Sequence, residues 1–187
     1  DLAIVQINAE YSYKELTVSD KTLYDYINKG EYKKNVARTA GDIDAGRLKC
    51  DKVFEHEYHD PYLAHAPMEP HTALARMEGE KLTVWASTQS PFGLQDSLVR
   101  EFGMSLENVR VITPFVGGGF GGKSSNRQGV EAARLARMTG KPVMVEWTRD
   151  EEFFYDTFHP ASVIKVKSGI DNSGNILLWD YHVYLAG

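Results

Sequence analysis

The stretch PFVGGGFGGKSS, residues 114–125, lies between a predicted strand and a predicted helix and places five glycines around one aromatic residue, Phe120. Without side chains, such a backbone can adopt positive φ values and let another group approach its amides closely. The amides precede a helix N-terminus, where they could face an anion or an electron-rich ligand. The stretch therefore predicts a ligand-binding loop, with a tight structural crossing as the alternative.

The same letters satisfy the phosphate-loop pattern G-x-x-x-x-G-K-[ST], with Gly117, Gly122, Lys123 and Ser124 at its fixed positions. In such a loop Lys123 would reach the terminal phosphates and Ser124 would hold Mg²⁺. The strands before the loop resemble hairpins, however, and parallel strands cannot be joined by hairpin turns. Glu146 also replaces the aspartate that usually directs Mg²⁺. A phosphate-loop nucleotide hydrolase remains one alternative function.

Hydrophobic periodicity predicts an α+β chain in which hairpin strands and helices form mixed layers. A turn-rich joint is expected at 39–46, and Gly79-Glu80 is expected to close a hairpin. Thr148 and Glu151 fit a capping box that starts a short helix. The other helices are expected at 20–29, 91–102 and 125–139, and the strands at 52–59, 72–78, 81–87, 108–116, 142–147, 162–169 and 175–186.

Composition narrows the classes of partner. The net charge of -5, with scattered lysines and arginines, argues against nucleic acid as a partner. No apolar run reaches the roughly 18–20 residues that span a bilayer. Cys50 is the single cysteine, so the chain itself can form neither an internal disulfide nor a cysteine-bound iron–sulfur cluster. The chain starts without methionine and ends in an apolar, strand-like run, so we expect it to be a piece of a longer protein.

Four motifs follow one another with the order and spacing of a known family. They are LAHAPMEPHTALA (63–75), VWASTQSP (84–91), VGGGFGGK (116–123) and GKPVMVEWTRDEEF (140–153). In these motifs the chain resembles the molybdenum-cofactor-binding subunit of the xanthine dehydrogenase and aldehyde oxidase family, the molybdenum hydroxylases. The resemblance implies the N-terminal part of a molybdopterin-binding domain over residues 51–187, preceded by a connecting segment over residues 1–50.

The resemblance also implies a chemistry and a site. Members of the family hydroxylate aldehydes or electron-poor ring carbons with oxygen from water, at a molybdenum ion held by a pyranopterin. Gln89 matches the catalytic glutamine whose amide binds an oxygen ligand of molybdenum, and it is expected to share one pocket with Phe120. No residue of this chain is expected to ligate the metal. The expected cofactor-binding residues are Gln89, Gly118, Gly119, Phe120, Gly121 and Gly122.

Two departures limit what the chain could do. Ser124 stands where purine-oxidising animal enzymes have a glutamate, which favours aldehydes or other N-heterocycles as substrates. The family's general base is a glutamate far downstream, and none of Glu146, Glu151 or Glu152 stands in a matching motif. The isolated chain is therefore expected to be inactive, as one wall of a larger site. A non-catalytic α+β module on the same scaffold is the second alternative function.

The expected partners follow from the resemblance. They are a small aldehyde or N-heterocycle, the remainder of the large subunit and an iron–sulfur electron-transfer subunit, with no nucleic acid and no membrane span. Iron–sulfur clusters and FAD are expected on other domains or subunits. The cofactor is expected to be molybdopterin, and whether it is the dinucleotide form stays open. A cytoplasmic location is expected, with the periplasm as the alternative.

Four histidines, His56, His59, His65 and His71, crowd a short region and raise the question of a zinc site. On a strand, His56 and His59 point to opposite faces, because side chains alternate with a period of two. We therefore predict ordinary surface or hydrogen-bonded histidines.

Overall fold

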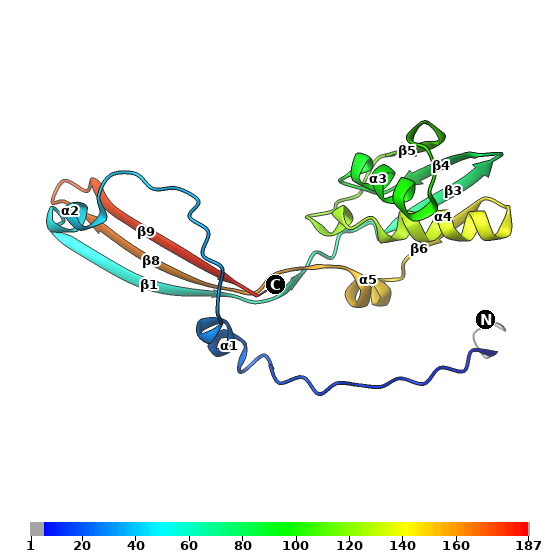
Figure 1. Ribbon diagram of the computed structural model, residues 1–187. Coiled ribbons are helices and arrows are strands. Elements are labelled where there is room, and N and C mark those ends of the chain that lie inside the picture. The colour runs from blue at the N-terminus through cyan, green and yellow to red at the C-terminus, as the bar shows by residue number, and fades with distance from the viewer. Residues whose placement is uncertain (1–5, 187) are drawn as a thin grey trace. The chain divides into compact units, whose positions relative to one another are not determined.

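The computed structural model describes residues 6–186, which form two compact units (Figure 1). One unit contains the chain up to Pro61 and from Ala161 onwards, and the other is Tyr62–Pro160. The predicted division between residues 50 and 51 stays a prediction, and the compact units change at residues 61 and 161. None of the helices within residues 6–186 has both the length and the apolar composition needed to cross a bilayer.

The Tyr62–Pro160 unit is built on a four-stranded sheet. Its spatial order is β5 (Val109–Ile112), β4 (Lys81–Ala86), β3 (Thr72–Glu78) and β6 (Val143–Glu146). Strand β3 pairs antiparallel with β4 across the predicted turn and antiparallel with β6. Strand β4 pairs parallel with β5, because a helix and not a hairpin connects them. The fold is α+β, as predicted.

Two helices, α3 (Pro91–Phe102) and α4 (Arg127–Thr139), pack on this sheet. Pro91 occupies the first turn of α3, and Gly103 ends that helix in the left-handed conformation, as predicted. The core of the unit joins alternate residues of β3 and β4 to the apolar faces of both helices. It consists of Ala73, Ala75, Leu82, Val84, Ala86, Leu94, Leu98, Val109, Ala132, Ala133 and Ala136.

Short elements complete this unit. The predicted capping box starts α5 (Arg149–Tyr155): the Thr148 side chain accepts from the Glu151 N–H, and Glu151 Oε2 accepts from the Thr148 N–H at 2.7 Å. Strand β2 (Leu63–Ala64) pairs antiparallel with β7 (Phe158–His159). Single 3₁₀ turns lie at Leu106–Asn108 and Gly122–Ser124.

The other unit contains a three-stranded antiparallel sheet. Strands β1 (Lys52–Asp60), β8 (Ser162–Ile170) and β9 (Ile176–Leu185) lie in that order. Helix α1 (Leu23–Lys29) buries Ile27 against Val163, and helix α2 (Ile43–Leu48) packs on β9. The α2 helix corrects the prediction of a turn-rich joint there. Its cap, Asp42, accepts from the Ala45 N–H and so stabilises one short helical turn.

Candidate functional site

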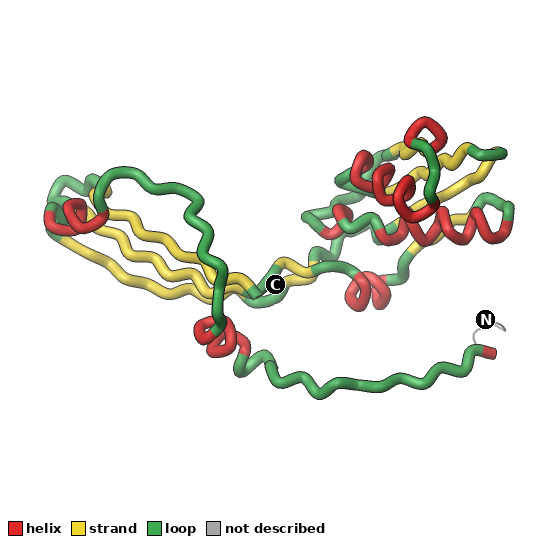
Figure 2. The backbone as a smooth tube through the Cα atoms, in the orientation of Figure 1, coloured by secondary structure: helices red, strands yellow, loops and turns green. Residues whose placement is uncertain are grey.

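The candidate site lies where β4 and β5 end. Parallel neighbouring strands bring their carboxyl ends to the same edge of a sheet, which is where ligands bind in many α/β folds. Gln89 follows the end of β4, and the glycine loop, defined here as residues 117–123, follows β5. Figure 2 shows this connection after β5 as loop with one short helical turn before α4. The parallel pairing therefore directs Gln89 and the glycine loop to the same place.

Hydrogen bonds join the two segments. The Gly121 N–H donates to Gln89 Oε1 at 2.9 Å, and the Gln89 N–H donates to the Lys123 carbonyl at 3.0 Å. The Thr88 hydroxyl donates to the same carbonyl at 3.3 Å. The structure thus brings Gln89 next to the predicted loop, while the catalytic role of Gln89 stays a prediction.

The loop conformation needs glycine at defined positions. Gly118 and Gly121 have φ values of 93° and 112°, which side chains strongly disfavour. Phe120 also has a positive φ, 52°, and non-glycine residues in that region concentrate at functional sites. A Cβ on Gly119 would lie 2.5 Å from Gln89 Oε1, so the amide fits only against bare backbone.

Several donors beside Gln89 are free. Within residues 6–186, the N–H groups of Gly118, Gly119 and Phe120 make no hydrogen bond to the protein, and of these three residues Gly119 is buried. The Gly121 amide, by contrast, binds Gln89, and the buried Gly122 donates its amide to the Gly119 carbonyl at 2.9 Å. A run of free backbone N–H groups can bind an oxygen-rich or anionic ligand.

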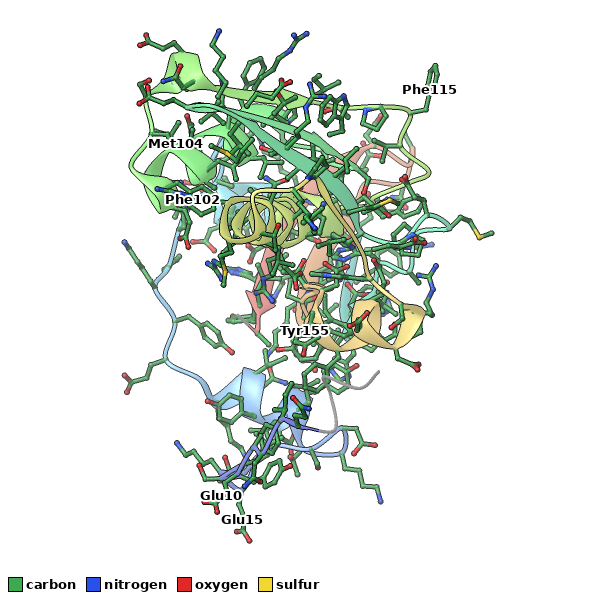
Figure 3. All side chains as sticks on the ribbon, turned by 90° about the vertical axis from the view of Figure 1, so that its right-hand side faces the viewer. Glu10, Glu15, Phe102, Met104, Phe115 and Tyr155 are labelled. Atoms are coloured by element: carbon green, nitrogen blue, oxygen red, sulfur yellow. The ribbon has the colours of Figure 1, made fainter. Side chains whose placement is uncertain are left out.

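Aromatic side chains flank these donors. The Phe120 side chain is 73% exposed, and Phe115 is fully exposed. Figure 3 shows Phe115 projecting outward from the connection after β5. Exposed aromatic faces beside polar donors suit a flat ligand that has both a ring and hydrogen-bond acceptors.

Lys123 does not face the candidate site. Its side chain is fully buried, and its Nζ donates to Glu69 Oε2 at 2.7 Å. Burial alone would raise the pKa of the Glu69 carboxyl, but the Lys123 ammonium and the Gly117 N–H outweigh burial and lower that pKa. A phosphate loop needs its lysine free to reach the phosphates. The phosphate-loop alternative is therefore not supported.

A polar network lies on the other side of the loop. His65 Nδ1 is 3.2 Å from Asp156 Oδ2, and a Cβ on Gly122 would lie 2.4 Å from the same oxygen. His71 Nδ1 is 2.7 Å from Glu152 Oε1, and its Nε2 is 3.7 Å from Asp156 Oδ1. Local sequence patterns did not identify this network, because His65 and Asp156 are 91 positions apart.

Part of the network is hydrogen-bonded, and two of its buried side-chain atoms, His71 Nε2 and Glu152 Oε2, have no hydrogen-bond partner within residues 6–186. His71, Glu152 and Asp156 lie close enough to hold a metal ion. However, Glu152 Oε1 already accepts hydrogen bonds from both the backbone N–H and the ring of His71. The hydrogen bonds of His65 and His71 to Asp156 and Glu152 thus form a support next to Gly121 and Gly122 of the glycine loop.

The four crowded histidines do not act as one set. His65 and His71 belong to this network in the Tyr62–Pro160 unit, whereas His56 and His59 lie on β1 of the other unit. His59 pairs with Glu57 at 2.8 Å, which is an ordinary surface contact. The prediction of hydrogen-bonded histidines thus agrees with the contacts of His59, His65 and His71.

Comparisons with known proteins point to one family. A family model described as a molybdopterin cofactor-binding domain matches residues 27–187. The chain is 34% identical over 148 residues to the probable hypoxanthine oxidase XdhD of Escherichia coli K12, a match covering 77% of this chain and 16% of that protein. It is 35% identical over 140 residues to the aldehyde oxidoreductase molybdenum-binding subunit PaoC of the same strain, covering 74% of this chain and 19% of that protein.

A solved structure has the same fold. Quinoline 2-oxidoreductase from Pseudomonas putida 86 matches with a TM-score of 0.67 and 21% identity, over 85% of this chain and 22% of that chain. The chain spans less than a fifth of the length of the two curated relatives above.

Proposed function

The chain belongs to the molybdopterin cofactor-binding family of the xanthine dehydrogenase and aldehyde oxidase type, and from this membership we propose that it forms one wall of a molybdopterin site. The enzyme containing this wall oxidises an aldehyde or an N-heterocycle with oxygen from water. Its further partners are the rest of the large subunit and an iron–sulfur electron-transfer subunit. One relative is named as an aldehyde oxidoreductase, which supports aldehydes as substrates, and the other is named for hypoxanthine, which is an N-heterocycle of the purine class.

The observation that carries the proposal is the orientation of the Gln89 amide. Its Oε1 accepts the Gly121 N–H, so the carboxamide has its NH₂ group left to donate to a ligand. The free N–H groups of Gly118, Gly119 and Phe120 lie in the same loop. These donors and the side-chain-free backbone fit a pterin, which presents many hydrogen-bond acceptors on a flat ring.

The chain's own residues bind and orient in this mechanism. When bound, molybdopterin supplies a metal centre that takes electrons from the substrate. The loop amides hold the cofactor, and Gln89 Nε2 donates to one of its acceptor atoms. A neutral amide can make that contact without adding charge near the reacting atoms. The exposed ring of Phe120 offers an apolar face against which the flat ring of the cofactor would pack.

The residue after the loop bears on the substrate. Ser124 is exposed and carries no charge, so it offers no carboxylate to a purine ring. An aldehyde or a non-purine N-heterocycle would not need a carboxylate at that position. We therefore place aldehydes and non-purine N-heterocycles first among the substrates to assay.

The test uses the full-length protein loaded with cofactor. Gln89→Ala is expected to keep the fold and the bound molybdenum but to lower kcat by roughly a hundredfold, because one preorganised polar contact is lost. Gln95→Ala is the matched control. Gln95 donates to the Val109 carbonyl at 2.7 Å, so its loss should lower the free energy of unfolding by about 1 kcal/mol and leave kcat unchanged.

Two results would count against the proposal. Near-normal turnover of Gln89→Ala would remove Gln89 from the site. An absence of molybdenum and pterin in the wild-type protein after cofactor loading would instead favour the non-catalytic module. The 187-residue chain alone is expected to show no hydroxylase activity.

A further inference from the structure

We propose that Glu69 and Lys123 are positioning residues that tie the two ends of the glycine loop together and hold its free amides ready for the cofactor. This inference rests on the proposed function, because the cofactor is what the tied loop would receive. Neither residue is expected to touch the cofactor, since both bind the protein itself.

One carboxylate oxygen receives both ends of the loop. Glu69 Oε2 accepts from the Gly117 N–H at 2.8 Å and from Lys123 Nζ at 2.7 Å. The Glu69 N–H donates in turn to the Gly117 carbonyl at 3.2 Å. The loop residues with free amides, Gly118 to Phe120, lie between these two anchored positions.

The buried charge of Lys123 requires the carboxylate of Glu69 as its partner. The Lys123 side chain is 0% exposed, and Glu69 is the one acidic residue that pairs with it within residues 6–186. A buried ammonium is costly unless an opposite charge lies beside it. Without the Glu69 carboxylate, the Lys123 ammonium would be buried and unpaired. It would therefore move toward solvent, and the end of the glycine loop would move with it.

Packing fixes the first end as well. A Cβ on Gly117 would lie 2.6 Å from Glu69 Cβ, so a residue with a side chain at position 117 would clash with Glu69. A loop anchored at both ends loses less conformational freedom when it binds a ligand. The tie should therefore strengthen cofactor binding without adding a contact to the cofactor.

Four variants of the full-length protein separate positioning from plain stability. Glu69→Ala removes both bonds of the carboxylate. Glu69→Gln is the conservative change, because its oxygen can still accept both bonds although it carries no charge. Lys123→Met breaks the tie and keeps an apolar side chain of similar length in the buried space. The double variant Glu69→Gln/Lys123→Met removes both charges together.

Three quantities are measured for each variant: the unfolding midpoint, the amide hydrogen exchange of the hydrogen-bonded loop residues Gly121 and Gly122 without cofactor, and the molybdenum and pterin bound per subunit. For Glu69→Ala we expect loop exchange to rise about tenfold or more and cofactor occupancy to fall. Glu69→Gln should show a smaller loss. In the double variant the unfolding midpoint should return toward wild type, because no unpaired charge is buried, while loop exchange and occupancy stay impaired.

The control is Glu101→Ala, which breaks the exposed ion pair with Arg134 in the same unit and should change none of the three quantities. Wild-type loop exchange and occupancy in the double variant would overturn the inference. Faster loop exchange in Glu69→Ala, in a protein that binds no molybdenum at all, would support the tie and count against the proposed function. The experiment therefore tests the positioning role of Glu69 and Lys123 separately from the proposed molybdopterin-binding function.

Discussion

At the scale of single residues, the conformation of the glycine loop requires positions without a Cβ atom. Gly119 is the clearest position, because its φ lies outside the left-handed region and only space forbids a side chain there. A Cβ would lie 2.5 Å from Gln89 Oε1 and 2.7 Å from the amide carbon. The residue type is thus set by its neighbour and not by its own backbone conformation.

Gly119→Ala in the full-length enzyme is therefore expected to push the Gln89 amide away from Gly121 and to lower turnover at least as much as Gln89→Ala, roughly a hundredfold. Steady-state kinetics and bound molybdenum test this. The control is Gly79→Ala, where nothing lies within 4 Å but φ is 59°. It should cost about 1 kcal/mol of stability through backbone strain and leave kcat unchanged. Normal turnover of Gly119→Ala would show that the amide can move without consequence.

At the scale of elements, one short helix positions two members of the network beneath the loop. Helix α5 carries Glu152, which is buried against His71, and Asp156 follows its end and contacts His65. The capping box at Thr148 and Glu151 satisfies N–H groups at the start of this seven-residue helix. A local sequence motif thereby supports a polar network whose other members come from the segment around residues 65–71.

Thr148→Ala should destabilise α5 by about 1 kcal/mol, because the first turn loses its side-chain acceptor. Amide exchange of residues 149–156 should rise, while exchange of the α3 core changes little. Thr148→Ser keeps the hydroxyl and is the matched control. Equal exchange in Thr148→Ala and wild type would mean that tertiary contacts alone hold the helix.

At the scale of the whole molecule, each compact unit has its own core. Leu98 belongs to the core of the Tyr62–Pro160 unit, and Ile27 belongs to the core under the β1–β8–β9 sheet. Both side chains are fully buried. Separate cores favour separate local unfolding reactions.

Leu98→Ala and Ile27→Ala should each cost about 2–5 kcal/mol through lost burial and the cavity left behind. Hydrogen exchange read peptide by peptide should show the loss in the mutated unit. The two variants serve as each other's control. If either substitution accelerates exchange equally in both units, the two units unfold in one cooperative reaction, which would contradict separate unfolding.

Local patterns predicted much of this protein. The hairpin at Gly79, the start of α3 at Pro91 and the capping box at Thr148 depend on residues within a few positions of one another, so the sequence reveals them directly. The four family motifs likewise predicted the fold and the molybdopterin family. Helix α2 was missed, because six residues give too short a pattern to separate from a turn.

By itself, the sequence determined that a loop rich in glycine follows a strand, and it predicted that Gln89 and this loop share one pocket. Tertiary structure decided what each group touches: Lys123 binds Glu69 and no phosphate, and His65 meets Asp156. The reason is physical. Conformational preferences depend on adjacent residues, whereas the partner of a buried charge depends on which distant segments the packed sheet and helices bring within about 3 Å.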